Sequence, residues 1–243
     1  MTSLRLDRLL ANLGYGSRKE VARLVEAGRV ALHGVAATKV EQGIPLADAR
    51  DGALTLDGEP VDPPAPLTVV LHKPPGYTCS HDERGLLVYD LLPPRWKTRK
   101  PALSCAGRLD KESTGQVILT DDGDLLHRII HPKSQAAKHY AVTLAHPLRG
   151  DEAALFATGT FVMAGDAKPL KPASWTPDDE RGGTMILHEG RFHQIRRMFE
   201  TLDNQVIALH RYQTGGLPLL DLPSGRYRIL DEAERRAVFA AGD

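Results

Sequence analysis

The chain has 243 residues, of which 42% are hydrophobic and 26% are charged, and its 31 basic side chains balance 31 acidic ones. This composition is that of an ordinary globular protein with room for one large domain, or for a small and a mid-sized one. No apolar run is long enough to span a membrane, and the N-terminus lacks the pattern of a secretory signal. Cys79 and Cys105 are too few for a disulfide framework or a zinc site. We therefore expect a cytoplasmic protein without a membrane partner.

The basic residues are distributed unevenly although the net charge is zero. Residues 1–42 carry seven basic and four acidic residues, residues 43–66 carry one and five, and residues 95–111 carry six and one. Such clusters are typical either of a solvated face or of a surface that binds nucleic acid. Charge alone leaves both interpretations open.

The first fifty residues predict a compact unit of two helices and a hairpin. An apolar stripe with helical spacing covers residues 6–13. Ser17 and Glu20 have the spacing of a capping box, which begins a second helix that Gly28 ends. Residues 29–35 have the pattern of a strand, a turn and a strand. A unit of this size buries little surface by itself.

Four prolines in residues 58–66 predict a semi-rigid linker. After it, strand and helix patterns alternate. The predicted strands are 67–71, 116–120, 140–144, 184–187 and 206–209, and the predicted helices are 123–130, 151–157, 191–202 and 231–240. The expected fold class is α+β, with a mainly antiparallel sheet in a domain of residues 67–243 and a small α/β domain of residues 1–57 before it.

Residues 107–115 contain the densest group of polar side chains. Asp110 lies there between basic residues, in a loop that leads into a strand. Loops on a rigid scaffold often hold catalytic groups. A single aspartate in a turn is nevertheless more typical of a local backbone cap, so the spacing alone does not make Asp110 catalytic.

The loop and several other segments together resemble one enzyme family. Residues 107–110, 113–115 and 119–123 resemble the catalytic motif of the pseudouridine synthases, in particular of the RsuA-type ribosomal RNA enzymes. Further segments agree in the family's order, namely 72–77, 138–140, 189–199, 209–211 and 215–216. Residues 1–50 resemble the S4 RNA-binding module, most clearly at 5–7, 17–20 and 28–30. The similarity implies the pseudouridine synthase fold preceded by an S4-like domain.

The resemblance also implies an activity, the isomerisation of a specific uridine in ribosomal RNA to pseudouridine. Asp110 would be the nucleophile, attacking either the ribose C1′ or the base C6. Arg196 would be the cation that keeps this carboxylate ionised, and Tyr140 would stack on the flipped uracil. From the residues alone, Arg196 could equally be a solvated or phosphate-binding helix residue, and Tyr140 a half-buried strand residue.

The same resemblance, with the charge pattern, implies a set of RNA contacts. Most would bind phosphates, which position an RNA without specifying it and make affinity fall steeply with salt. Arg108 could instead help to hold the extruded nucleotide, and Lys73 and Lys138 could be either phosphate contacts or structural partners. The expected contacts are Arg5, Arg8, Ser17, Arg18, Lys19, Arg23, Arg29, Lys73, Arg108, Lys138 and Arg191.

No cofactor is implied, because the reaction breaks one glycosidic bond and makes another without redox change. The sequence has no dinucleotide-binding or phosphate-loop motif. His188 and His193 do not have the spacing of a helical zinc motif, so we expect no metal. The expected partner of a monomeric enzyme is ribosomal RNA. Residues 192–194 are most similar to the enzymes of small-subunit (16S) rRNA, and 23S rRNA is the alternative.

Two other functions are compatible with parts of the sequence. A non-catalytic S4-type RNA-binding protein is disfavoured by the presence of Asp110, Tyr140 and Arg196 together. A different enzyme on nucleosides or sugars could use the aspartates of residues 121–124 as a carboxylate pair. We prefer a turn and a helix N-cap for these aspartates, and the N-terminal module disfavours this function.

Overall fold

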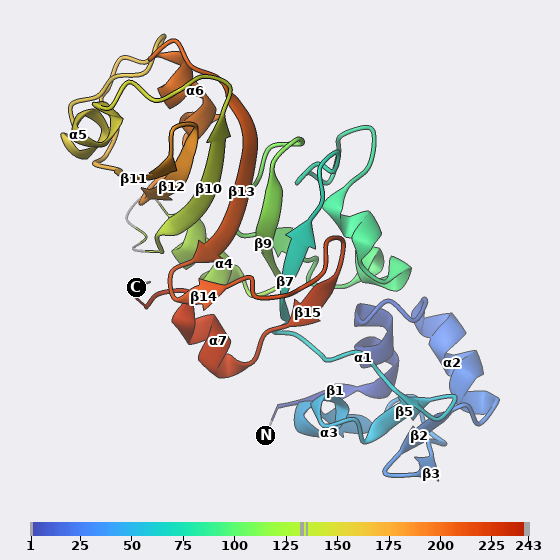
Figure 1. Cartoon of the computed structure of the whole chain (residues 1–243). Helices are drawn as coiled ribbons and strands as arrows, with labels where there is room; N and C mark the ends of the chain where they lie inside the picture. The colour runs from blue at the N-terminus through green and yellow to red at the C-terminus, as the bar shows by residue number, and fades with distance from the viewer. Residues whose placement is uncertain (1, 132–133, 135, 241–243) are drawn as a thin grey trace. The chain divides into compact units, whose positions relative to one another are not determined.

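A computed structural model describes residues 2–131, 134 and 136–240, and these form two packed units (Figure 1). The first unit consists of Met1–Leu67, Leu92–Ser104 and Thr120–Asp122. The second consists of Thr68–Leu91, Cys105–Leu119 and Gly123–Asp243. Among the described residues, no helix has the length and apolar character that crossing a membrane requires.

The first unit contains the two predicted helices and two small sheets. The capping box forms as predicted, since the Ser17 hydroxyl accepts from the Glu20 N–H at 3.3 Å and the Glu20 carboxylate accepts from the Ser17 N–H at 2.7 Å. The apolar stripe of the first helix is buried in this unit's core. The helices are α1 (Leu6–Asn12), α2 (Arg18–Glu26) and α3 (Leu46–Arg50). The sheets are β1 (Ser3–Arg5) with β4 (Gly43–Pro45), and β3 (Val35–Ala36), β2 (Val30–Leu32), β5 (Leu54–Leu56) and β6 (Glu59–Pro60) in that order.

The proline-rich segment is packed within the first unit rather than extended as a linker. Its first residues form β6, which pairs with β5. Asp62 then accepts two hydrogen bonds from the Arg95 guanidinium. The Arg50 guanidinium donates to the carbonyl groups of Pro64 and Ala65. These contacts come from residues distant in sequence, which the proline content could not reveal.

Residues 92–104 and 120–122 join the same unit through a buried ion pair. The Arg99 guanidinium lies 3.2 Å from the Asp121 carboxylate, and both side chains are buried. Arg99 also donates to the Pro63 carbonyl at 3.0 Å, and Asp121 accepts from the Leu67 N–H at 2.6 Å. Asp121 is therefore a structural carboxylate, which removes it from the disfavoured carboxylate pair for sugar chemistry.

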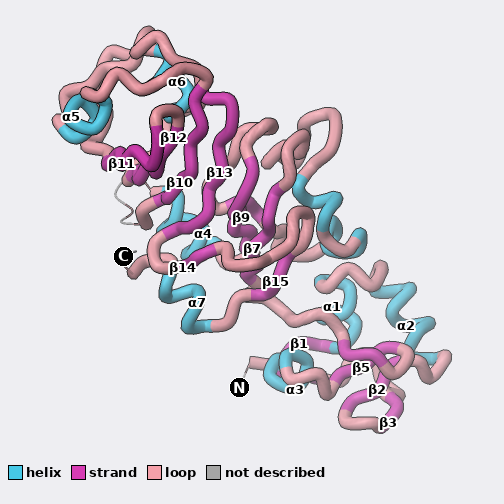
Figure 2. Tube along the Cα trace, viewed as in Figure 1, coloured by secondary structure: helices cyan, strands magenta, loops and turns pink. Residues whose placement is uncertain are grey.

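The second unit is built on one nine-stranded sheet, as far as the described residues show (Figure 2). Its order is β11-β12-β10-β13-β9-β7-β15, with β14 on β13 and β8 on β9. Most of the pairings are antiparallel, while β13 and β9 are parallel. The strands are β7 (Thr68–Lys73), β8 (Ser104–Cys105), β9 (Thr114–Thr120), β10 (Lys138–Leu144), β11 (Ser174–Asp179), β12 (Gly182–Leu187), β13 (Val206–Thr214), β14 (Leu217–Pro218) and β15 (Tyr227–Ile229). The predicted α+β class with a mainly antiparallel sheet is confirmed.

The α-helices of the second unit correspond to the four predicted helices. They are α4 (Gly123–Ile130), α5 (Glu152–Ala157), α6 (Gln194–Glu200) and α7 (Glu232–Ala237). A core cluster that includes Val70, Ile118 and Ile129 packs strands against α4. Helix α6 begins three residues later than predicted, because His193 has a left-handed backbone with φ of 49°. Residues 191–193 therefore belong to a loop.

Candidate active site

The loop of residues 107–115 enters β9 through a glycine that no other residue can replace without a clash. Gly115 has φ of +108°, and it pairs with Arg211 of the parallel strand β13. A Cβ atom at Gly115 would lie 2.2 Å from the Arg211 carbonyl oxygen. Glycine alone tolerates both the backbone angle and this approach. The close contact sets the position of the loop relative to β13.

The buried side chain of Arg211 holds the backbone that precedes Asp110. Arg211 is 2% exposed. Its Nη2 donates to the Gly107 carbonyl at 2.9 Å, its Nη1 to the Arg108 carbonyl at 3.4 Å, and its Nε to the Gln116 carbonyl at 2.7 Å. A planar guanidinium can bind several acceptors in one fixed geometry. Arg211 thus links both ends of the loop to β13.

Lys73 holds the backbone that follows Asp110. Its Nζ donates to the carbonyl groups of Pro74 at 3.0 Å, Lys111 at 2.8 Å and Ser113 at 2.7 Å. The side chain is completely buried, and this burial lowers the pKa of the ammonium group. An ammonium group has three donors, and all of them are used here. Of the two roles open to Lys73 from the sequence, a phosphate contact or a structural partner, these hydrogen bonds favour the structural one.

The Asp110 carboxylate lies between two basic side chains at the start of α6. Arg196 Nε is 3.7 Å from Asp110 Oδ2, and His193 Nε2 is 3.5 Å from Asp110 Oδ1. The Asp110 side chain remains 30% exposed, so a substrate can reach it. Arg196 also donates to the Val206 carbonyl at 2.9 Å and to Ser113 Oγ at 3.4 Å. These bonds orient the guanidinium toward the loop.

His193 is a member of this group that the sequence did not identify. The sequence analysis considered it as a candidate metal ligand and as part of a family segment, and gave it no role beside Asp110. Its spacing from Arg196 gives no reliable signal, because His193 precedes α6 with a left-handed backbone and the rule for neighbouring side chains holds only within a helix. Within the described part of the chain, no group of three or more His, Cys, Asp or Glu residues could hold a metal ion.

Tyr140 is connected to the loop through Arg211. It lies on β10 opposite Arg211 of β13, and the guanidinium carbon is 6.0 Å from the centre of the tyrosine ring. The tyrosine is 7% exposed, so only a small part of the ring is accessible. Arg211 was named in the sequence analysis only as part of a matching segment, yet it contacts both the loop and this ring.

Three other predicted RNA contacts lie in the second unit and differ in accessibility. Lys138 donates to the Ala136 carbonyl at 3.3 Å, and burial lowers its pKa to about 8. Arg191 donates to the Asp166 carboxylate at 3.0 Å and to the Lys168 carbonyl at 2.9 Å, so it organises a loop. Arg108 is the accessible one, with 68% of its side chain exposed.

The predicted contacts in the first unit are all exposed, but some have partners within that unit. Arg5 pairs with Asp7 at 3.1 Å, and Arg29 pairs with Asp57 at 2.6 Å. Ser17 belongs to the capping box, which makes it a structural residue. The exposed cations on the helices α1 and α2 are Arg8, Arg18, Lys19 and Arg23.

Comparison with known proteins now gives the class of this fold and site. Residues 67–201 match the RNA pseudouridylate synthase family, and residues 4–44 match the S4 domain. The chain therefore belongs to the RNA pseudouridylate synthase family and carries an S4 domain. It is an enzyme that converts uridine to pseudouridine in RNA.

Individual relatives extend over nearly the whole chain. The ribosomal small subunit pseudouridine synthase A of Escherichia coli (strain K12) is 37% identical, with 97% of this chain and 100% of that protein covered. An uncharacterized RNA pseudouridine synthase of Bacillus subtilis (strain 168) is 38% identical, with 95% and 96% covered. A crystal structure of a pseudouridylate synthase is similar with a TM-score of 0.66 and 32% identity, and it covers 97% of this chain and 100% of its own.

Proposed function

We propose that the enzyme isomerises a uridine of small-subunit (16S) rRNA, with Asp110 as the nucleophile, Arg196 as its cationic partner and Tyr140 as the ring that contacts the flipped uracil. The observation that carries the catalytic assignment is the position of the Asp110 carboxylate, between Arg196 and His193 on a loop held from both sides. The rRNA target is supported by relatives named ribosomal small subunit pseudouridine synthase A, which are 32–38% identical to this chain.

The chemistry requires an ionised carboxylate and a base that has left its stack. The N1–C1′ bond of uridine breaks, the uracil turns, and C5 bonds to C1′. The hydrogen on C5 leaves as a proton and N1 takes up a proton, so the product is an isomer of the substrate. Asp110 holds the nucleotide covalently during this exchange. Arg196, whose guanidinium stays charged, lies beside this carboxylate with Nε at 3.7 Å from Asp110 Oδ2. Tyr140 replaces part of the stacking that the uracil loses on flipping.

The first unit supplies affinity for the RNA in this proposal. Its S4 domain carries the exposed cations Arg8, Arg18, Lys19 and Arg23. Phosphate contacts by such residues bring the RNA to the enzyme and position it. We propose that the enzyme acts as a monomer in the cytoplasm.

Pseudouridine mapping in cells that lack the gene tests both parts of the proposal. We expect one 16S uridine to lose its modification, and the wild type to restore it. Asp110→Asn should not restore it, because an amide is a poor nucleophile. Asp221→Asn is the matched control, since Asp221 is an exposed aspartate of the second unit and should restore the modification fully.

The outcomes separate the catalytic residue from the substrate. Restoration by Asp110→Asn would refute Asp110 as the nucleophile. A lost modification in 23S rRNA, with 16S rRNA unchanged, would refute the proposed substrate and leave the catalytic assignment standing.

A further inference from the structure

Phe192 is an aromatic side chain held in solvent next to the catalytic loop. It is 76% exposed, more than any other large hydrophobic residue in the described part of the chain, and the other members of that group are aliphatic. A single exposed apolar side chain needs no explanation by itself. The construction of the loop around Phe192 is what makes its exposure informative.

Hydrogen bonds order the loop on both sides of Phe192. The Glu189 carboxylate accepts from the Lys171 N–H and from the Gln194 side-chain amide, both at 3.0 Å. Gln194 Oε1 accepts from the Arg191 N–H at 2.9 Å, and Arg191 binds Asp166. The ring is therefore presented by an ordered loop and does not project from a loosely held segment.

His193 supports one face of the Phe192 ring and connects it to the nucleophile. The two ring centres are 3.8 Å apart, and their planes differ by 16°. The same imidazole places Nε2 at 3.5 Å from Asp110 Oδ1. His193 adopts its left-handed backbone with φ of 49°, a conformation that the surroundings must enforce in a residue with a side chain. One imidazole ring thus separates the exposed phenyl ring from the proposed nucleophile.

We propose that Phe192 is a stacking site for an unpaired nucleobase that flanks the target uridine. This inference rests on the proposed function, because it takes Asp110 as the point where the uridine reacts. Extruding a uridine also leaves its neighbours without a stacking partner, and an exposed aromatic face replaces it. Tyr140 is nearly buried and is assigned to the target base, whereas the Phe192 ring is open on the face opposite His193.

The ligand class is therefore a base of single-stranded RNA, recognised by its π face. Stacking on an aromatic side chain is tolerant of base identity. Phe192 then contributes affinity and positions the RNA strand beside Asp110, while other contacts select the uridine.

Binding and turnover of three Phe192 variants test this site. Phe192→Ala and Phe192→Leu should each raise the Kd for unmodified 16S transcript about 5- to 150-fold, which corresponds to the loss of one base–aromatic stack. Phe192→Trp should keep the affinity of the wild type. The rate of tritium release from transcript labelled at uracil C5, measured with saturating RNA in a single turnover, should fall by a smaller factor than the affinity does, since saturating RNA compensates for the lost binding.

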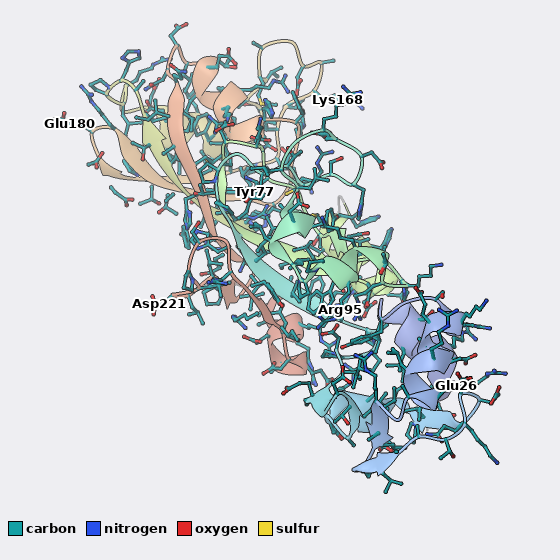
Figure 3. All side chains as sticks on the ribbon, turned by 90° about the vertical axis from the view of Figure 1, so that its right-hand side faces the viewer. Glu26, Tyr77, Arg95, Lys168, Glu180 and Asp221 are labelled. Atoms are coloured by element: carbon teal, nitrogen blue, oxygen red, sulfur yellow. The ribbon has the colours of Figure 1, made fainter. Side chains whose placement is uncertain are left out.

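The controls distinguish stacking from a general loss of structure. Leu220→Ala is a matched control, because Leu220 is an apolar residue of the same unit with 69% of its surface exposed. It lies away from the Phe192 loop: the adjacent Asp221 and Lys168, whose carbonyl group accepts from Arg191, are on opposite sides of the unit (Figure 3). Its Kd should equal that of the wild type. Phe192→Leu keeps an apolar side chain but removes the ring, so wild-type affinity in this variant would overturn the proposal.

A fluorescence measurement separates this site from the catalytic assignment. The native Trp96 and Trp175 are 4% and 5% exposed, so surface stacking should not quench them. In the double variant Phe192→Trp, Asp110→Asn, adding 16S or 23S transcript should quench the new tryptophan, with Asp110→Asn alone as the control. Unchanged emission at saturating transcript would refute the stacking site. Wild-type turnover by Asp110→Asn together with quenching would instead refute only the role of Asp110.

Discussion

Two buried cations of the second unit, which holds the catalytic loop, and the exposed cations of helix α2 in the first unit are used in opposite ways. Lys73 and Arg211 are buried, and they bind backbone carbonyl groups on the two sides of Asp110. Arg18, Lys19 and Arg23 lie exposed on α2. In the sequence, Lys73 and Lys19 both appear as basic residues in motifs associated with RNA. The comparison teaches that burial decides whether such a cation organises the enzyme or meets the substrate.

The energetic reason is the cost of removing a charge from water. A buried ammonium or guanidinium group is tolerated only when its donors are satisfied. Carbonyl oxygens of a polar loop supply those acceptors and are themselves fixed by the cation. Positioning of a reacting group is valuable in catalysis, since a displacement of about 1 Å can reduce the rate about 100-fold.

The largest effect should follow from removing a buried cation. Lys73→Met keeps the length of the side chain but leaves three carbonyl groups without their donor. We expect the free energy of unfolding to fall by about 3 kcal/mol, because each unsatisfied buried group costs about 1–3 kcal/mol. The turnover rate with saturating RNA should fall about 100-fold through displacement of Asp110. Denaturant titration and single-turnover tritium release measure the two effects.

An exposed lysine provides the control for this variant. Lys39→Met, in the first unit, should change the free energy of unfolding by less than about 0.5 kcal/mol. A Lys73→Met enzyme that folds and turns over at the wild-type rate would show that the loop does not depend on this cation.

An intermediate effect should follow from neutralising the exposed cations of α2. The triple variant Arg18→Gln, Lys19→Gln, Arg23→Gln should weaken binding of 16S transcript about tenfold or more and reduce the slope of log K against log salt by about 2. Stability and the turnover rate with saturating RNA should stay close to those of the wild type. Filter binding over a range of salt concentrations measures the slope. An unchanged slope would mean that α2 does not contact phosphates.

The smallest effect is a pH dependence of stability that comes from Lys138. This side chain is half-buried and donates to the Ala136 carbonyl group. Its pKa is lowered by burial to about 8 from 10.5. Between pH 8 and 10.5 the unfolded chain therefore binds more protons at this residue than the folded chain, so stability rises with pH in that window. Across this pH window, the free energy of unfolding of the wild type should rise on the order of 1 kcal/mol more than that of Lys138→Met. Denaturant titrations of both proteins at pH 7.5 and pH 10 test this. The same change in the free energy of unfolding in both proteins would contradict the lowered pKa.

Much of the fold could be predicted because its signals are local. The capping box at Ser17, the apolar run that forms β7 and the alternation of strands and helices depend on neighbouring residues. The start of α6 could not be predicted in this way. A left-handed residue at position 193 has no signature in the sequence, so Phe192 and His193 were expected in the helix.

Residues named by a motif could be proposed for the site from the sequence, whereas residues whose role depends on packing could not. Arg196 was expected beside Asp110, and its Nε lies 3.7 Å from Asp110 Oδ2, while the catalytic roles of both residues stay a proposal. The burial of Lys73 depends on carbonyl groups 38 and 40 residues further along the chain. The contribution of His193 depends on the fold that brings α6 to the loop. Neither relation is visible from residue type or spacing.

The composition of the first unit has a consequence for synthesis on the ribosome. The chain contributes to this unit three times, and its last contribution, Thr120–Asp122, includes the buried partner of Arg99. Domains usually fold in the order in which they emerge. Here the N-terminal unit cannot be completed until residue 122 has emerged, after the strand β7 of the catalytic unit has already been made. Folding of the first unit therefore cannot finish before synthesis of the second unit has begun.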